Sequence, residues 1–284
     1  MLIDGHNAAI PLHEPRDPAA ARNMPVLADL GSREEPALMQ VTTTRRLSQR
    51  LLQLGLRRAD GRAFAFRPGQ FCRIAVPTGD GSVWRSYSIA TPALEGGSSE
   101  ICEVAITAME GGLATEYLFG LAPGECVRMS GPFGRLVLPD TDPAHYLLIG
   151  TGTGMAPYRA MLPELEKRTR AASGRLNVTL LMGVRAPSEA LYIEDFLEFV
   201  AHAPDRRQLL VSYSRQLPEV PEWFETAGHV QSQLAGLRLS SSEARVMLCG
   251  NPEMIDDCSA ALAERGFDTK TLVREKYLAG PRPR

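Results

Sequence analysis

A glycine-rich turn between an apolar run and a helical run constrains the fold of this chain more than any other feature. Residues 145–150 (HYLLIG) predict a strand, and residues 157–171 predict a helix. The turn between them carries Gly150, Gly152 and Gly154. Glycine lets a backbone approach a phosphate closely, and the free N–H groups at a helix amino end carry partial positive charge. The turn therefore suits a phosphate, although taken alone it also fits a plain tight strand–helix connection.

Strands and helices continue to alternate after this turn. Strands are predicted over 176–184, 207–213, 245–250 and 269–275, and helices over 189–200 and 253–265. Such alternation indicates a parallel sheet with helices on both faces and with ligands at the carboxyl ends of its strands.

The first half of the chain follows a different pattern. Short β-type runs separated by Gly and Pro fill residues 38–139, with one helical stretch at 111–124. This pattern is typical of a small antiparallel barrel. In the run QFCRIAV, Cys72, Ile74 and Val76 share one face of a strand, and Arg73 points the other way.

The turn-rich stretch PDTDP at 139–143 is the best boundary between the two patterns. Residues 1–37 are rich in Pro, Ala and Arg and show no regular period, so a mobile extension is predicted there. We therefore expect an extension at 1–37, a barrel domain at 38–140, an α/β domain at 144–277 and a tail at 278–284.

Charge and cysteine spacing exclude several kinds of protein. The 31 Lys and Arg against 33 Asp and Glu give a formal charge of −2, hence no general attraction to nucleic acid or to an anionic membrane. The sequence has neither an apolar run of about 18 residues nor the apolar centre of a secretory signal, so we expect a cytoplasmic protein. The closest of the five cysteines, Cys249 and Cys258, are nine positions apart, which rules out tight zinc or iron–sulfur motifs. No metal site is predicted, and redox chemistry would need a bound organic cofactor.

A second motif is the run RSYS on a predicted barrel strand. By alternation, Arg85 and Tyr87 share one face, and Ser86 and Ser88 share the other. A guanidinium can pair with a diphosphate, and a tyrosine ring can lie against a flat heterocycle. The alternative is an ordinary strand with an exposed arginine and a packed tyrosine.

The ends of two predicted parallel strands carry hydroxyl and guanidinium groups. One strand ends at Val184 and Arg185, and the next runs into Ser214 and Arg215. These groups suit the 2′-phosphate of NADP, whereas the acidic residue that would bind an NAD ribose is missing from the first of these strand ends. The alternative is that both arginines are solvated surface.

Two helix starts complete the set of motifs. Residues 110–115 (EGGLAT) open the barrel's helix and would suit a second phosphate contact, unless Thr115 merely caps that helix. Cys249 ends an apolar strand just before Gly250, Asn251 and Pro252. This places a thiol at the ligand edge of the sheet, although a buried cysteine is commonly only a small hydrophobe.

In order and spacing, RSYS, the Gly-Gly helix start, GTGTGMAP, the Ser-Arg pair and CGNPEM closely resemble the ferredoxin–NADP reductase family, particularly its bacterial ferredoxin/flavodoxin reductases. The resemblance covers residues 38–277. It implies an FAD-binding antiparallel β-barrel followed by an NADP-binding parallel α/β domain. It also implies a flavoenzyme that transfers electrons between NADPH and a separate ferredoxin or flavodoxin.

The resemblance also implies roles for single residues. Those that would bind FAD are Arg85, Ser86, Tyr87, Ser88, Gly112, Leu113, Ala114, Thr115, Thr151 and Tyr277. Those that would bind the adenosine end of NADP and line the rest of its groove are Val184, Arg185, Ser214, Arg215, Asn251, Pro252, Glu253 and Asp257. Ser88 near flavin N5, Cys249 beside the nicotinamide and Tyr277 over the flavin would be catalytic. Ser88 and Glu275 are candidates for moving a proton.

Two departures from the family pattern and three alternatives remain open. Seven residues follow Tyr277, which leaves its stacking role over the flavin open. His229 stands where many relatives have an arginine, which weakens the preference for NADP over NAD without reversing it. The chain could instead be an NADH-linked reductase component of a multicomponent oxygenase, or a non-catalytic flavin-binding redox subunit. The arginines of 43–58 are interpreted as solvated strand faces rather than as a docking patch for an acidic ferredoxin. We expect a monomer.

Overall fold

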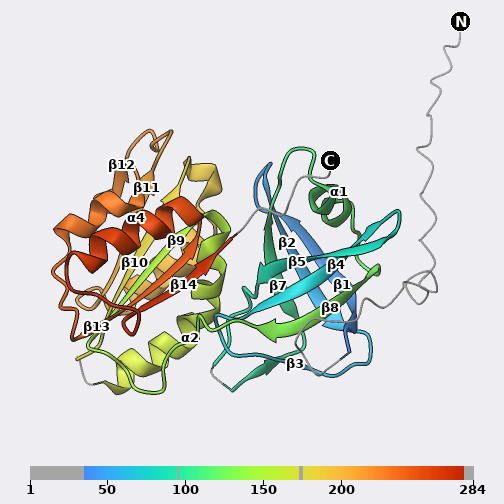
Figure 1. Cartoon of the computed structure of the whole chain (residues 1–284), viewed down its shortest axis with the longest axis horizontal. Coiled ribbons are helices and arrows are strands. Elements are labelled where there is room, and N and C mark those ends of the chain that lie inside the picture. The colour runs from blue at the N-terminus through green and yellow to red at the C-terminus, as the bar shows by residue number, and fades with distance from the viewer. Residues whose placement is uncertain (1–34, 95, 173–174, 278–284) are drawn as a thin grey trace, which may run out of the picture.

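The structure is a computed structural model and describes residues 35–94, 96–172 and 175–277. The predicted tail at 278–284, and the predicted extension as far as residue 34, lie outside the described residues. Two bodies lie side by side, one built around an antiparallel sheet and one around a parallel sheet (Figure 1). This architecture confirms the predicted fold class.

The first body is a six-stranded antiparallel barrel. Its strands, in the order β5-β4-β8-β1-β2-β7, are β5 (Gly81–Ser88), β4 (Phe71–Thr78), β8 (Cys126–Phe133), β1 (Ala37–Arg46), β2 (Leu51–Arg58) and β7 (Cys102–Thr107). A bridge between Ile89 and Val104 joins the two outermost strands and closes the barrel. A small pair, β3 (Phe64–Ala65) and β6 (Ser98–Ser99), stands apart from this sheet.

Side-chain alternation builds the core of the barrel. On β4, Cys72, Ile74 and Val76 are fully buried and Arg73 is partly exposed, as predicted. The helix α1 (Leu113–Phe119) adds buried Leu118 to the same core. This helix is shorter than the predicted 111–124 because the backbone leaves the helix at Gly120.

The second body is a parallel sheet in the order β12-β11-β10-β9-β13-β14. Its strands are β9 (His145–Thr151), β10 (Asn177–Val184), β11 (Arg207–Tyr213), β12 (Glu225–Ala227), β13 (Ala244–Gly250) and β14 (Leu272–Lys276). The chain builds outward from β9 in one direction and then returns to add β13 and β14 on the other side. Ligands of such sheets bind where the order reverses, which here is between β9 and β13.

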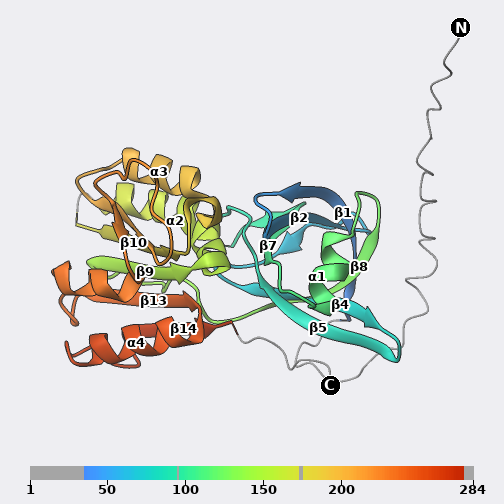
Figure 2. The same ribbon diagram turned by 90° about the horizontal axis from the view of Figure 1, so that it is seen from above.

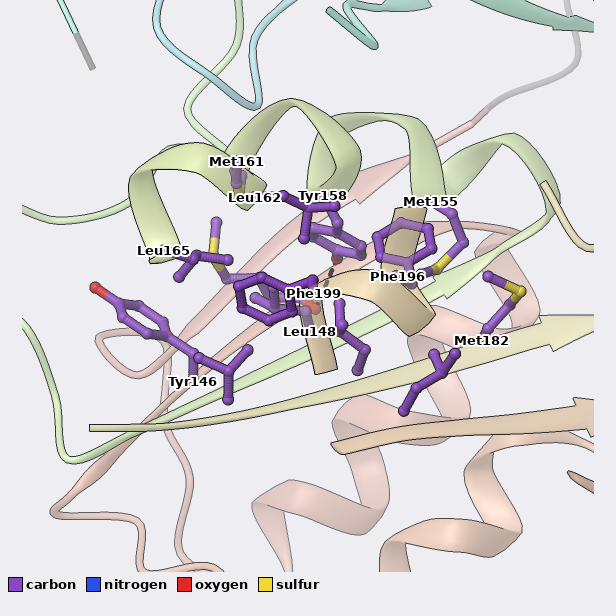
Figure 3. Close-up of a cluster of buried hydrophobic side chains, with 14 of the residues drawn as sticks. Tyr146, Leu148, Met155, Tyr158, Met161, Leu162, Leu165, Met182, Phe196 and Phe199 are labelled. Atoms are coloured by element: carbon purple, nitrogen blue, oxygen red, sulfur yellow. Dashed lines mark hydrogen bonds between the residues drawn. The ribbon is translucent and has the colours of Figure 1, made fainter. Parts of the chain in front are cut away.

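Helices cover both faces of this sheet (Figure 2). The helices α2 (Ala156–Ala171) and α3 (Ile193–Ala201) lie on one face, and α4 (Pro252–Ala263) lies on the other. Tyr146 and Leu148 of β9 point toward α2 and α3, where Figure 3 shows Phe196 and Phe199 of α3 in the same cluster. The alternate residues of β9 pack with α4. Within the described residues, no helix is long and apolar enough to cross a membrane.

Two predicted element starts are wrong. The helix predicted from residue 189 begins at Ile193, because Tyr192 adopts a left-handed conformation with φ of 59°. A short 3-10 helix, η3 (Pro187–Glu189), precedes it. The last strand begins at Leu272 rather than at residue 269, because the Asp268 carboxylate accepts the N–H groups of Lys270 and Thr271 in a turn.

One arginine connects the two bodies. Arg159 of α2 donates to the Glu103 carboxylate on β7 at 2.6 Å and to the Ala90 carbonyl of the barrel at 3.0 Å. The same guanidinium pairs with Asp195 of α3 and lies 4.3 Å from the centre of the Tyr192 ring. An apolar cluster that spans both bodies packs nearby and consists of Leu51, Ala90, Ala105, Ala156 and Leu191. A partly buried ion pair and an apolar cluster therefore join the two bodies.

We predict that Arg159→Gln lowers the free energy of unfolding by about 1–3 kcal/mol, because it leaves two carboxylates without their cation in a partly buried place. The matched control is Arg170→Gln on the same helix. Arg170 pairs with Glu166 at 2.6 Å, but its side chain is 71% exposed, so we expect a loss of at most about 0.5 kcal/mol. Urea denaturation measures both variants, and equal losses would contradict the prediction.

Candidate functional site

A groove of about 900 Å³ runs along the carboxyl ends of the parallel strands and reaches the barrel. The loops after β9, β10, β11 and β13 form most of its wall. Arg50, Leu51 and Thr107 line it from the barrel side. Its position at the reversal of strand order is where an α/β sheet binds nucleotides.

The glycine-rich turn is shaped by close packing against β13. After β9, the 3-10 helix η2 (Gly152–Met155) leads directly into α2. A Cβ on Gly154 would collide with the carbonyl oxygen of Cys249, so only glycine allows the start of α2 to approach β13 this closely. Gly250 has φ of +121°, and Thr151 Oγ1 accepts the N–H of Asn251 at 2.9 Å. The loops after β9 and β13 thus interlock at the middle of the groove.

Sheet register places Cys249, a predicted catalytic residue, next to Glu275, the predicted candidate for moving a proton. Cys249 of β13 pairs with Gly150 of β9 on one side and with Glu275 of β14 on the other. The N–H of Tyr277 then donates to the Gly250 carbonyl at 2.8 Å, which turns the tyrosine over the end of β13.

The last residue of barrel strand β5 meets Glu275 and Tyr277 from the other body. The Ser88 hydroxyl donates to Glu275 Oε1 at 3.3 Å and forms a short hydrogen bond with the Tyr277 hydroxyl. The Tyr277 hydroxyl also donates to the carbonyl oxygen of Thr153 at 3.4 Å. Ser88 is 3% exposed, so this contact is shielded from solvent. Ser88, Glu275 and Tyr277 therefore converge where the two bodies meet.

Burial controls the protonation of this cluster. It raises the pKa of the Glu275 carboxyl to about 7, against the opposing effect of the Ser88 hydrogen bond. It also raises the pKa of the Cys249 thiol and of the Tyr277 hydroxyl well above their ordinary values. At neutral pH the thiol and the phenol keep their protons, and Glu275 can hold or release one.

The barrel offers groups that fit the diphosphate and ring of FAD. Arg85 donates to the Trp84 carbonyl at 3.2 Å and, within the described part of the chain, forms no ion pair, so its charge is available to an anion. Gly112 is the N-cap of α1, and no side chain of the described residues caps that helix, which leaves its first N–H groups free. Thr115 lies inside the helix, and its hydroxyl accepts the N–H of Met109 at 2.8 Å. Tyr87 packs partly against the barrel core.

The far end of the groove holds the predicted nucleotide residues. The N–H of Ser214 donates to the Val184 carbonyl at 2.9 Å, and that of Arg215 donates to the Arg185 carbonyl at 3.1 Å. These bonds place the ends of β10 and β11 together, so Arg185 and Arg215 are neighbours in the backbone, and both residues line the groove. Asn251 caps α4 by accepting the N–H of Glu253 at 2.7 Å, and Pro252 follows as the first residue of that helix.

The groove brings some predicted residues together and leaves others apart. Those that line it are Thr151, Val184, Arg185, Ser214, Arg215, Asn251, Glu253, Asp257 and Tyr277. Those that lie on the barrel are Arg85, Ser86, Tyr87, Ser88, Gly112, Leu113, Ala114 and Thr115. Cys249 is fully buried and does not line the groove, and its thiol lies against the hydroxyl of Tyr277. Among the described residues, no group of three or more His, Cys, Asp or Glu could hold a metal ion.

Sequence patterns did not reveal Arg50, Leu51, Thr107 or Glu189 as groove residues. Arg50 belongs to the arginine-rich stretch interpreted as a solvated strand face, and it enters the groove only because the barrel docks there. Thr107 donates to Thr153 Oγ1 at 3.4 Å across the same junction. Periodicity carries no signal for contacts between two domains.

Two family models match the chain. An oxidoreductase FAD-binding domain matches residues 39–138, and an oxidoreductase NAD-binding domain matches residues 148–260. Ferredoxin–NADP reductase B of Sorangium cellulosum is 33% identical over 250 residues, which are 86% of this chain and 98% of that relative. The toluate 1,2-dioxygenase electron transfer component of Pseudomonas putida is 28% identical over 84% of this chain and 67% of that protein.

A solved structure shares the fold. The crystal structure of a ferredoxin NADP+ reductase from Neisseria gonorrhoeae with bound FAD and NADP has a TM-score of 0.71 and 19% sequence identity. The similarity covers 86% of this chain and 99% of that chain.

We predict that Gly154→Ala lowers the free energy of unfolding by about 2–3 kcal/mol, because the new methyl group meets backbone of a central strand that cannot move aside. Gly152→Ala is the matched control, since Gly152 has φ of +53° and open space around it. That change should cost only about 1 kcal/mol of backbone strain. Urea denaturation distinguishes the two, and a control variant as costly as Gly154→Ala would contradict the packing argument.

We further predict that Glu275 makes stability depend on pH. Its pKa rises from 4.5 to about 7 on folding, so the native state binds the extra proton between these values and stability falls as pH rises through this window. The loss reaches at most about 3 kcal/mol above pH 7. Glu275→Gln should remove this loss of stability. Ser88→Ala should extend the loss to higher pH, because the variant lacks the hydrogen bond that favours the carboxylate. Urea denaturation from pH 5 to pH 8 measures this, and parallel curves for wild type and Glu275→Gln would refute it.

Proposed function

Because this chain belongs to the ferredoxin–NADP reductase family and is an FAD- and NAD(P)-dependent oxidoreductase, we propose that it transfers electrons between NADPH and a separate ferredoxin or flavodoxin. One observation carries the proposal. Ser88 of the barrel meets Glu275 and the groove residue Tyr277, so the element that would hold a flavin faces the element that would hold a nucleotide.

The barrel residues would hold and orient FAD. Arg85 and the first N–H groups of α1 would bind the diphosphate, and Tyr87 would lie against the ring system. Bound FAD supplies the chemistry that the side chains lack, since it accepts a hydride and passes electrons on singly. The Ser88 hydroxyl would lie beside the reacting edge and keep it in register with the groove.

The groove residues would bind the nucleotide. Arg215 and Ser214 would contact the 2′-phosphate, which favours NADPH over NADH. The interlocked turns at Thr151 and Asn251 would support the middle of the nucleotide. Glu275, whose pKa of about 7 lets it gain or lose a proton near neutrality, would hold a proton next to Ser88.

The electron carrier would be a separate protein. The sequence has no motif for an iron–sulfur cluster, and Cys72, Cys102, Cys249 and Cys258 are buried as free thiols. Family membership favours an enzyme over the non-catalytic binding subunit. A reductase component of an oxygenase is the second candidate, because the relative from Pseudomonas putida is named as the electron transfer component of a dioxygenase.

Anaerobic stopped-flow mixing tests the proposal. The FAD-loaded protein is mixed with NADPH or NADH, and bleaching of the flavin absorbance is followed. We expect NADPH to bleach the flavin faster than NADH does, and at lower concentrations. The reduced protein should then reduce an added ferredoxin or flavodoxin. A strong preference for NADH would favour the oxygenase component, and a flavin that neither nucleotide bleaches would overturn the proposal.

We predict that Ser88→Ala slows flavin reduction by about tenfold to a hundredfold at saturating NADPH, because it removes a hydrogen bond at the reacting edge. The dissociation constant for NADPH should stay within about twofold, since Ser88 is not a groove residue. Ser82→Ala, at the other end of β5 about 20 Å away, is the control and should match wild type. An unchanged rate in Ser88→Ala would remove Ser88 from the reaction.

A further inference from the structure

A carboxylate lies in the part of the groove that Arg185 and Arg215 line. Glu189 receives Arg185 Nε at 2.9 Å on one oxygen and Arg185 Nη2 at 2.8 Å on the other. Both residues line the groove, and their side chains are 21% and 32% exposed. The pair is therefore a two-point contact inside the nucleotide site and not a loose surface pair.

The backbone fixes this contact. The 3-10 helix η3 turns the chain back after Ala186, and the N–H of Glu189 donates to the Ala186 carbonyl at 3.0 Å. Glu189 thereby faces the arginine four positions earlier. The contact uses the N–H of Nε and one N–H of Nη2, so three N–H groups of Arg185 stay available as donors. The pair as a whole has no net charge.

Arg215 differs from Arg185 in this respect. Among the described residues it forms no ion pair, and it lines the groove next to Ser214. The charges of these three side chains therefore sum to one positive unit, because Arg185 and Glu189 cancel and Arg215 remains. The other charged residues that line the groove are Arg50 of the barrel and Glu253 and Asp257 of α4. A 2′-phosphate brings about −1.5 to −2 charges, whereas a ribose hydroxyl brings none, so net charge here decides between the two nucleotides.

We propose that Glu189 sets the nucleotide preference by neutralising Arg185, so that Arg215 alone supplies net charge for the 2′-phosphate. The groove then accepts both NADPH and NADH and prefers NADPH only modestly. This inference rests on the proposed function, because it takes the groove as the site of a nicotinamide dinucleotide. It adds that a carboxylate outside the family motifs limits discrimination between the two.

The opposite role for Glu189 predicts opposite signs. If Glu189 acted by holding Arg185 in place for the phosphate, its removal would weaken binding of the phosphorylated nucleotide. Under neutralisation, its removal raises the local charge from one positive unit to two and strengthens that binding. The two roles also differ in a double variant, since removing both members of a neutral pair leaves the net charge as it was.

Calorimetry with 2′,5′-ADP and 5′-AMP tests the proposal, because these ligands differ by the 2′-phosphate and neither reduces a flavin. The FAD-loaded protein is titrated at low salt. We expect Glu189→Gln to bind 2′,5′-ADP about three- to tenfold more tightly, and Arg185→Gln to bind it about three- to tenfold more weakly. The double variant should bind it within about twofold of wild type. Affinity for 5′-AMP should change less than about twofold in every variant.

Two further variants complete the design. Arg215→Gln should weaken 2′,5′-ADP binding by about tenfold or more, because it removes the net charge. Glu198→Gln is the matched control, since Glu198 is an exposed carboxylate of α3 outside the groove, and it should change neither affinity by more than about twofold.

The outcomes separate this inference from the proposed function. Weaker or unchanged 2′,5′-ADP binding in Glu189→Gln, or a double variant as weak as Arg185→Gln, overturns the role of Glu189. If those affinities behave as expected but NADPH fails to bleach the flavin, the electron-transfer proposal fails and the role of Glu189 stands. Failure of wild type to bind 2′,5′-ADP at all would overturn both.

Discussion

The close approach of Gly154 to the carbonyl of Cys249 is the constraint on which the rest of the structure depends. It sets the start of α2 directly against β13, at the point where the strand order reverses. Because helix geometry is regular, fixing the start of α2 also fixes the positions of the residues in its first turn. A glycine without a side chain thus determines where Arg159 lies, and through it the position of the barrel.

Arg159 links this placement to the cluster of Ser88, Glu275 and Tyr277. Its ion pair with Glu103 on β7 fixes the barrel edge, and Thr107 on the same strand contacts the glycine-rich turn at Thr153. The last residue of β5, Ser88, then meets Glu275 and Tyr277. A chain of short contacts, each between rigid elements, brings together residues that are up to 189 positions apart in the sequence.

Much of this architecture could be predicted from the sequence, because period and punctuation are local signals. The alternating face of Cys72, Ile74 and Val76 and the strand–helix rhythm after residue 144 are such signals. The helix start at Ile193 could not be predicted, since it depends on a left-handed Tyr192 that packs under Arg159. The contacts that Arg50 and Glu103 make at the junction could not be predicted either, because they form only after the two bodies come together. The Arg185–Glu189 pair is local, but it depends on the η3 turn, which the helix predicted from residue 189 does not contain.

The Arg159–Glu103 pair is shielded from solvent, and in this respect it differs from charges on the surface of the protein. The side chains of Arg159 and Glu103 are only 16% and 23% exposed, so dissolved ions reach this pair poorly. The charges at an encounter surface between two proteins are fully hydrated until the proteins meet, and added electrolyte weakens them first. Ionic strength is therefore a selective probe here: across the physiological range it would change how often the proposed electron carrier meets the protein, while the shielded Arg159 pair keeps the internal geometry fixed.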